Sequence, residues 1–546
     1  MIRSVLLTLI VLLFSNVLLG QRREFTMQDT LRGSITEERK WWDLAYYHLD
    51  ISVDPSDSTI EGSNTVGYRV LEPGQVMQID LQPPLTLRKA EQAGNELKIT
   101  DDGNAHYIHL LSDQKVGQYY EVKLWYGGHP HVALRPPWSG GIQWEHDQNG
   151  NPFIATSCQG IGASIWWPCK DHMYDEPDSM LISVNVPAGL TDVSNGRLRK
   201  VEEHDNQTKT YHWFVSNPIN NYGVNINIAD YAHFSEVFQG EKGALDCDYY
   251  VLRDNLDKAK EQFKQAPMML EAFEYWFGPY PFYEDGYKLV EVPYPGMEHQ
   301  SSITYGNGYE NGFGGRDGSR SGWGMKFDFI IIHESGHEWF ANSITYKDVA
   351  DMWIHESFIN YSENLYVEYH YGIEAGREYV LGTRMGIRND RPIIGTYDVN
   401  SGGSGDMYPK GGNMLHTLRQ LIQDDGKWRS ILRGLNEEFY HQTVTTEQIE
   451  QYIIDHSGLD LSGFFDQYLR DQRLPVLEYS IKANEIYYRY SNCIRGFDLP
   501  LKVTVSGEEQ WINPTTRWAT LEVESAEATF AVDPNFYIAV LNITGR

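Results

Sequence analysis

The stretch Phe327-Asp-Phe-Ile-Ile-Ile-His-Glu-Ser-Gly-His-Glu-Trp-Phe340 carries the strongest pattern in this chain. His333 and His337 are four positions apart, so one turn of a helix places both imidazoles on the same face, where they can bind one metal ion. Glu334 follows the first histidine and can act as a general base toward a water at that metal. The pattern H-E-x-x-H predicts a zinc site, and a random chain of this composition would contain it about 0.04 times.

A third ligand is expected on a second helix. Glu356 follows His337 after eighteen intervening residues, which leaves room for a loop and the start of another helix. Requiring this spacing lowers the chance expectation to about 0.003. Because catalytic zinc usually takes three protein ligands, His333, His337 and Glu356 predict one Zn²⁺ per chain. The alternative is that Glu356 is a capping or surface carboxylate; His355, its neighbour, should face away from the metal.

Periodicity divides the rest of the chain into three parts. Residues 21–253 alternate with period two between turn motifs, which predicts a mostly β domain. Residues 254–474 show helical spacing, interrupted by the glycine-rich segment 306–324, and form the predicted catalytic domain. We expect that segment to be a surface loop, with the rim of a cleft as the alternative. Residues 475–546 alternate again and predict a small β-sandwich.

The N-terminus has the pattern of an export signal. Arg3 precedes a ten-residue apolar run, which is about half of the ~20 residues that a membrane-spanning helix needs. Residues 1–20 are therefore predicted to be a signal peptide, with an uncleaved anchor as the alternative. We expect an exported (periplasmic or secreted) protein that is soluble after cleavage and has no integral membrane segment.

Composition excludes several classes of protein. The 546 residues carry a formal net charge of −30, which repels phosphate, so nucleic acid is not an expected partner. The chain has only four cysteines, which excludes a disulfide scaffold and a zinc ribbon. Whether Cys158 and Cys169 pair is left open.

Three further segments resemble a known family. Pro295-Gly-Met-Glu-His-Gln300 is similar to the G-x-M-E-N motif of the aminopeptidase N family of gluzincins, peptidase family M1, and Tyr408-Pro-Lys-Gly411 is similar to its Y-x-K-G segment. The run 446–469 resembles the end of that family's catalytic domain. The resemblance implies a multidomain α+β fold: an N-terminal, mostly β, saddle-like domain, a thermolysin-like and mainly helical catalytic domain with a small sheet, and a C-terminal β-sandwich.

The resemblance also implies roles for individual residues. Glu298 would anchor the α-ammonium of a substrate, and Gly296 and Met297 would contribute to substrate binding. Gln159 would make a second contact with the amine; the weaker alternative is a turn amide. Tyr408 would donate its hydroxyl to the developing oxyanion.

Glu363 comes seven residues after Glu356 and so lies on the same helix face, where it could orient a ligand histidine. Lys410 is expected to be structural.

The chain departs from the family pattern in places. His299 replaces the usual Asn, which affects substrate preference and could add a titrating group. His355-Glu356-Ser357 replaces the usual N-E-G. We also expect this chain to lack the helical C-terminal domain found in many relatives, which would leave the cleft more open.

These observations together predict a zinc aminopeptidase acting on peptides with a free N-terminus. A thermolysin-type zinc endopeptidase is the first alternative, and an epoxide hydrolase or a non-catalytic zinc-binding surface protein are weaker ones. The oligomeric state is not predicted.

Overall fold

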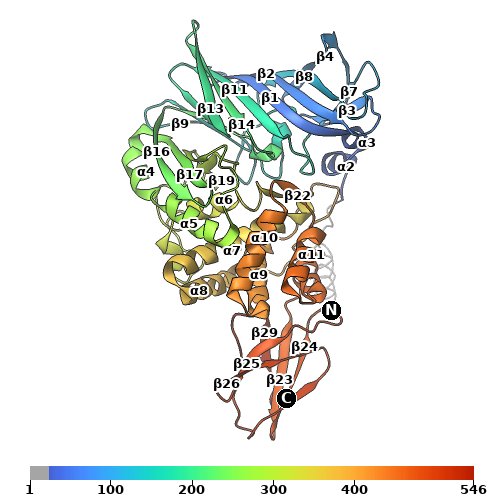
Figure 1. Cartoon of the computed structure of the whole chain (residues 1–546), viewed down its shortest axis with the longest axis vertical. Coiled ribbons are helices and arrows are strands. Elements are labelled where there is room, and N and C mark those ends of the chain that lie inside the picture. Colours follow the sequence, from blue (N-terminus) through green and yellow to red (C-terminus); the bar gives the residue numbers. More distant parts are fainter. Residues whose placement is uncertain (1–23, 546) are drawn as a thin grey trace, which may run out of the picture.

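The computed structural model describes residues 24–545. The predicted signal peptide, residues 1–20, lies outside this range. Within it, no helix combines the length and the apolar character needed to cross a membrane. Figure 1 shows the β-rich N-terminal part at the top, helices in the middle and two small sheets at the bottom.

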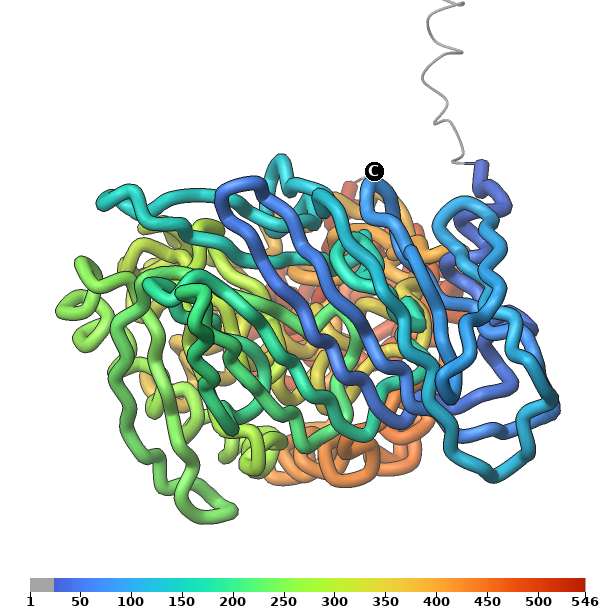
Figure 2. Tube along the Cα trace, turned by 90° about the horizontal axis from the view of Figure 1, so that it is seen from above, coloured from blue at the N-terminus to red at the C-terminus, as the bar shows by residue number. Residues whose placement is uncertain are grey.

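The N-terminal part is built on one large, mainly antiparallel sheet. Its central strand β1 buries alternate residues such as Leu49, Ile51 and Val53, as a half-covered strand should. Figure 2 shows these strands running side by side over the rest of the molecule. In spatial order the eight strands are β13 (Arg197–His204), β14 (Thr208–Val215), β11 (Ser179–Pro187), β1 (Trp42–Asp54), β2 (Thr59–Val70), β8 (Tyr119–Gly128), β4 (Thr86–Gln92) and β5 (Asn95–Glu96).

Two smaller sheets and two short helices complete this part. The sheets share a buried apolar cluster with the large sheet, which includes Trp166 and Trp167. The first sheet contains β3 (Val76–Asp80), β7 (Ala105–His109) and β6 (Lys98–Asp102); the second contains β12 (Thr191–Ser194), β15 (Ile226–Ala229), β10 (Pro152–Ser157) and β9 (Gly141–His146). The helices are α2 (Met27–Gly33) and α3 (Glu37–Lys40).

A five-stranded sheet joins the N-terminal part to the helices. The predicted boundary between residues 253 and 254 falls between its second and third strands, which pair in parallel. In spatial order its strands are β16 (Tyr231–Gly240), β17 (Gly243–Leu252), β18 (Tyr287–Glu291), β20 (Ile303–Tyr305) and β19 (Gly296–Met297). The domain boundaries stay predictions.

Helices dominate the middle of the chain. Their ends follow local sequence: Asp328 caps α6 by accepting from the N–H groups of Ile330 and Ile331, and Gly278, with φ 95°, ends α5 where the Gly-Pro pair predicts a stop. The helices are α4 (Leu256–Gln262), α5 (Gln265–Phe277), α6 (Phe329–Gly336), α7 (Trp353–Tyr371), α8 (Ile373–Thr383), α9 (Pro409–Ile422), α10 (Asp425–Glu438), α11 (Thr446–Ser457) and α12 (Ser462–Phe465). A two-stranded sheet, β21 (Ile344–Tyr346) with β22 (Gln442–Val444), packs among them.

Two small sheets follow the helices. Their buried residues, such as Leu477 and Val503, continue the apolar core of the helical region. One sheet contains β27 (Ala519–Glu522), β24 (Glu485–Ser491), β23 (Val476–Lys482) and β29 (Ala539–Asn542), and the other contains β26 (Glu508–Ile512), β25 (Leu501–Val505) and β28 (Phe530–Val532). The predicted fold class, multidomain α+β with a β-rich N-terminal part and a helical catalytic region, is confirmed.

Candidate metal centre and substrate cleft

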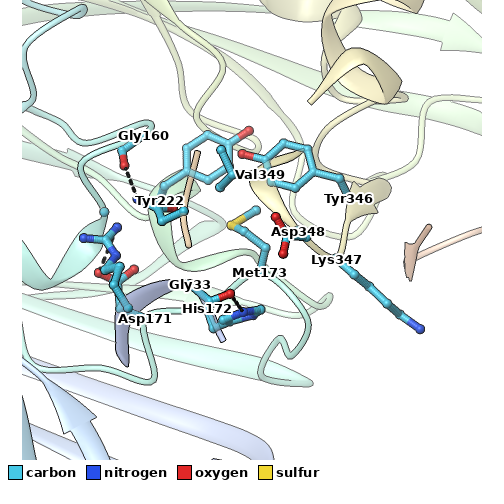
Figure 3. A pocket seen from close by; sticks show the side chains of 13 residues that line it. Gly33, Gly160, Asp171, His172, Met173, Tyr222, Tyr346, Lys347, Asp348 and Val349 are labelled. Carbon is cyan, nitrogen blue, oxygen red and sulfur yellow. Dashed lines mark hydrogen bonds and ion pairs between the residues drawn. The ribbon is translucent and has the colours of Figure 1, made fainter. Parts of the chain in front are cut away.

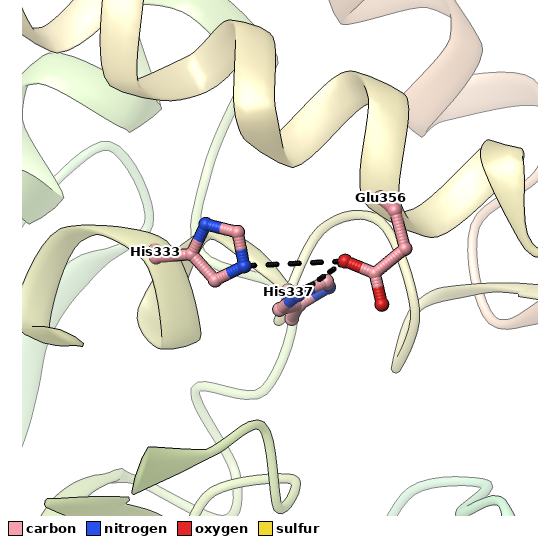
Figure 4. Close-up of side chains that lie close together, drawn as sticks. All are labelled: His333, His337 and Glu356. Atoms are coloured by element: carbon pink, nitrogen blue, oxygen red, sulfur yellow. Dashed lines mark ion pairs between the residues drawn. The ribbon is translucent and has the colours of Figure 1, made fainter. Parts of the chain in front are cut away.

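Two helices bring the three predicted ligands together. α6 carries His333 and ends next to His337, and the first turn of α7 carries Glu356. Glu356 Oε2 lies 3.9 Å from His333 Nε2 and 3.5 Å from His337 Nε2. All three donor atoms lie within 4.8 Å of one another, and all three residues are buried. Figure 4 shows the two imidazoles turned toward one oxygen of the carboxylate.

Hydrogen bonds on the far side of each imidazole fix its orientation. His333 Nδ1 lies 2.8 Å from Glu363 Oε1, and His337 Nδ1 lies 3.0 Å from the carbonyl oxygen of Phe340. Both Nε2 atoms are therefore directed at the same point, and Glu356 Oε2 has no hydrogen-bond partner there. Two imidazole nitrogens and a carboxylate oxygen converging on one buried point form a donor set that fits Zn²⁺.

Burial dominates the electrostatics of this centre. It lowers the pKa of His333 to about 4, so the imidazole is neutral near pH 7 and available as a ligand. It raises the pKa of Glu356 to about 7. Burial, followed by repulsion from Glu298 and Glu356, raises the pKa of Glu334 well above its usual range. A bound cation would lower the pKa values of these carboxyl groups, because it favours their charged forms.

Glu298 lies next to the metal centre. Its carboxylate forms a second close group with Glu334 and His337, with donor atoms also within 4.8 Å of one another. The Gln159 amide nitrogen donates to Glu298 Oε1 at 2.6 Å and to Glu356 Oε1 at 3.3 Å, and the Tyr222 hydroxyl donates to Glu298 Oε1 at 3.1 Å. Gln159 is thus held across the two carboxylates.

Tyr222 and Asn342 also contact Glu298, and the sequence did not predict them as site residues. Tyr222 comes from the N-terminal part, and the Asn342 amide donates to the backbone oxygen of Glu298 at 2.9 Å. Neither residue lies in a motif or at a periodic spacing from one, so no sequence pattern could have identified them.

The predicted substrate-binding strand β19 packs directly against α6. Gly296 and Met297 pair antiparallel with Tyr305 and Thr304 of β20. A Cβ atom on Gly296 would lie 2.6 Å from Ile330 Cγ2, so only glycine permits this close approach.

The departures from the family pattern have structural explanations. Burial lowers the pKa of His299 to about 3, so this imidazole stays neutral and does not add the titrating group considered above. His355 accepts a hydrogen bond from the Tyr346 N–H at 3.0 Å and so faces away from the metal centre, as expected. Lys410 is buried and donates to the Asp471 carbonyl at 3.0 Å.

All four cysteines lie within residues 24–545 and are free thiols, so Cys158 and Cys169 are not joined by a disulfide in this structure.

A cavity of about 540 Å³ opens over the metal centre. Tyr408 lines it beside the predicted metal ligands, and its ring stacks on that of His333 with centroids 6.2 Å apart. Phe313 and Gly318 also line it, so the glycine-rich segment 306–324 forms part of the rim. The expectation of a plain surface loop was wrong, and the cleft-rim alternative describes the segment better.

A second, smaller hollow of about 30 Å³ lies behind the Gln159 loop. Figure 3 shows residues of the N-terminal region, including Gly33 and Asp171, facing Tyr346 and its neighbours across it. Arg32 of α2 pairs with Asp171 at 3.4 Å and donates to the Ile161 carbonyl. Residues 159–162 are therefore held in place from behind by Arg32 of α2, a contact that no sequence motif predicts.

Comparison with known proteins agrees with this architecture. The Peptidase M1 N-terminal domain matches residues 44–222, and the Peptidase family M1 domain matches residues 262–468. The chain is 21% identical to leukotriene A-4 hydrolase of Xenopus laevis over 443 residues, 76% of this chain and 68% of that protein. It is 20% identical to probable aminopeptidase 1 of Sulfurisphaera tokodaii over 418 residues, 71% of this chain and 50% of that protein.

A solved structure shares the fold. The M1 zinc metallopeptidase of Deinococcus radiodurans, crystallised as a mutant bound to a Tyr-Ser-Ala substrate, superposes with a TM-score of 0.66 at 19% identity. The superposition covers 79% of this chain and 95% of that one. The fold and the His–His–Glu centre together define a zinc metallopeptidase. The chain belongs to peptidase family M1.

Proposed function

We propose that this protein is an aminopeptidase that removes the N-terminal residue from peptides. The observation that carries the proposal is the position of Glu298, whose buried carboxylate opens onto the same cavity as Glu334 and the metal ligands. A buried carboxylate needs a cationic partner, and its protein contacts are with the neutral donors Gln159 and Tyr222. The α-ammonium group of a peptide would supply that cation.

One Zn²⁺ per chain would be held by His333, His337 and Glu356. When bound, zinc supplies Lewis-acid chemistry that polarises a scissile carbonyl and acidifies water. Glu363 keeps His333 in the tautomer that presents Nε2, and the backbone carbonyl of Phe340 does the same for His337.

Two other polar groups, Glu334 and Tyr408, would transfer the proton of the attacking water and stabilise the negative charge that develops on the carbonyl oxygen. Glu334 removes a proton from the attacking water and passes it to the leaving amine. The Tyr408 hydroxyl donates to the carbonyl oxygen as that oxygen becomes negative. Gln159 and Glu298 would fix the free amine beside the residues that would hold the metal, so that the first peptide bond is the one presented to them, and Gly296 and Met297 would line its path.

The layout of the whole chain forms part of the proposal. Residues 1–20 would direct export, residues 21–253 would supply Gln159 and Tyr222, residues 254–474 would carry the zinc centre, and residues 475–546 would form the terminal β-sandwich. The expected substrates are peptides with a free N-terminus.

The test compares aminoacyl chromogenic substrates with their N-acetylated forms, with and without a chelator. Acetylation removes the ammonium charge and leaves Glu298 unpaired, which should cost about 3–5 kcal/mol, or ~10² to 10³-fold or more in kcat/KM. The chelator should abolish cleavage, and added Zn²⁺ should restore it. Cleavage of the acetylated form at a similar rate would overturn the proposal in favour of an endopeptidase.

A further inference from the structure

We infer that Asn400 is a positioning residue for the free amine of the substrate. It lies in the segment between α8 and α9 of the helical region, and it lines the small hollow behind the loop of residues 159–162 that carries Gln159. The inference rests on the proposed function, because it takes Gln159 and Glu298 as the groups that bind the amine. It adds a residue that holds Gln159 in register with Glu298.

Two glycines make this loop adaptable. Gly160 and Gly162 have φ angles of 76° and 95°, where glycine has no steric penalty and many conformations are open to it. The Gly162 N–H closes the turn by donating to the Cys158 carbonyl at 2.7 Å. A turn of this kind can pivot as a unit, so the direction in which Gln159 points depends on contacts from outside the loop.

Three side chains from outside the loop bind its backbone carbonyls. The Asn400 amide donates to the Gly160 carbonyl at 3.0 Å, which is the dashed line at Gly160 in Figure 3. The Ile161 carbonyl accepts from the Gln82 amide at 2.9 Å and from the Arg32 guanidinium. Gln82 and Arg32 belong to the N-terminal part, as the loop itself does. Of these three side chains, Asn400 is therefore the one that ties the loop to the helical region.

This tie matters because Gln159 has to meet two carboxylates of the helical region. Its amide nitrogen donates to both Glu298 and Glu356, which leaves the amide oxygen as the acceptor for a substrate ammonium. Gly160 follows Gln159 directly, so the Asn400 contact fixes the adjoining peptide group relative to these carboxylates. A displaced loop would turn the amide oxygen away from the amine while the metal ligands stay in place.

Asn400 is itself held in a defined position. Its φ of 49° is left-handed, a conformation that Asn adopts more readily than most residues. The Thr396 N–H donates to the Ser401 carbonyl at 3.0 Å and closes the turn that carries Asn400. Gly33 of α2 packs so closely against this turn that a Cβ atom on it would lie 2.1 Å from the Asn400 nitrogen. The tether therefore starts from a fixed point.

The experiment separates amine binding from metal binding with two hydroxamates. Alanine hydroxamate carries a free amine, whereas propanohydroxamic acid has the same skeleton without it, and both bind zinc through the hydroxamate oxygens. Calorimetric titration of the zinc-loaded full chain gives Kd for each. Kinetics on alanine p-nitroanilide give kcat and KM for the same preparations.

Two variants remove the donor in different ways. Asn400→Gly keeps the left-handed backbone and removes the amide, and Asn400→Asp keeps the shape of the side chain but cannot donate. Both should weaken alanine hydroxamate about 3- to 10-fold, as expected for the loss of one hydrogen bond, and raise KM by a similar factor. The Kd of propanohydroxamic acid and kcat should stay within about twofold of the parent values.

Asn492→Gly is the matched control. Asn492 also has a left-handed φ of 52°, and its amide donates to the Leu474 carbonyl at 2.9 Å beside the C-terminal sheets. Its replacement should change neither Kd. Hydrogen–deuterium exchange of the metal-free protein gives a readout that does not depend on activity: residues 159–166 should exchange faster in Asn400→Gly and at the parent rate in Asn492→Gly.

Two failures can be told apart. If the parent protein binds both hydroxamates equally well, it does not recognise the free amine, and the proposed function fails. If the parent prefers alanine hydroxamate but the Asn400 variants keep the full preference, or lose affinity for both compounds equally, the proposed function stands and the role of Asn400 is overturned. Unchanged exchange of residues 159–166 in Asn400→Gly would also overturn it.

Discussion

Replacing Glu363 should weaken zinc binding without removing a ligand. Glu363 Oε1 lies 2.8 Å from His333 Nδ1, and its Oε2 accepts a 2.6 Å hydrogen bond from the Tyr379 hydroxyl. Burial raises the pKa of Glu363 to about 8, while the bound cation and the His333 N–H favour the charged carboxylate. We therefore expect Glu363 to orient the His333 imidazole and to make it a stronger ligand for zinc.

The size of the effect follows from these two contacts. Glu363→Gln keeps the shape and an acceptor for His333 but loses the charge, and should lower zinc affinity about tenfold, or ~1.4 kcal/mol. Glu363→Ala removes the acceptor and should lower it about 100-fold, or ~2.7 kcal/mol. It also leaves the buried Tyr379 hydroxyl unpaired, which costs a further ~1–3 kcal/mol of folding free energy even without zinc.

Competition with a chromophoric chelator measures the zinc affinity, and thermal unfolding with and without zinc measures the stability. Glu378→Gln is the matched control, because Glu378 is an exposed carboxylate of α8 that accepts a hydrogen bond from the Trp323 indole. Its zinc affinity should equal that of the parent protein. Unchanged affinity in both Glu363 variants would refute the reasoning that this carboxylate acts through His333.

Three further substitutions test the other groups. Glu334→Gln should abolish turnover while stoichiometric zinc, measured by metal analysis, stays bound; appreciable residual kcat would remove Glu334 as the base. Tyr408→Phe should lower kcat about 10²- to 10³-fold with little change in KM, and a loss confined to KM would contradict its role toward the oxyanion. Arg32→Gln should raise KM several-fold for free-amine substrates at nearly constant kcat, because the loop carrying Gln159 loses its support; steady-state kinetics showing an equal loss on N-acetylated substrates would indicate general damage instead.

The convergence of the three predicted ligands could be predicted because their geometry is local. Four positions along a helix place His333 and His337 on one face, and the first turn of the next helix brings Glu356 to the same point. Glu363 lies two turns further along α7, so the same helix brings it next to His333. The alternating and helical stretches likewise indicated the α+β architecture.

The surroundings of Glu298 were not predictable in the same way. Tyr222, Asn342 and Arg32 reach the site through tertiary packing of segments far apart in sequence, which no periodicity records. The glycine-rich segment was misjudged for a similar reason, since its composition suits a loop anywhere and only packing places Phe313 on the rim. His299 looked like a titrating group, but burial keeps it neutral.

The most direct test of the central claim is a time course of peptide digestion by the zinc-loaded protein, followed by mass spectrometry. An unblocked peptide of about ten residues should give a ladder of products shortened one residue at a time from the N-terminus, and its N-acetylated twin should remain intact. Internal fragments from both peptides would contradict the account. They would show that cleavage does not require a free amine bound at Glu298.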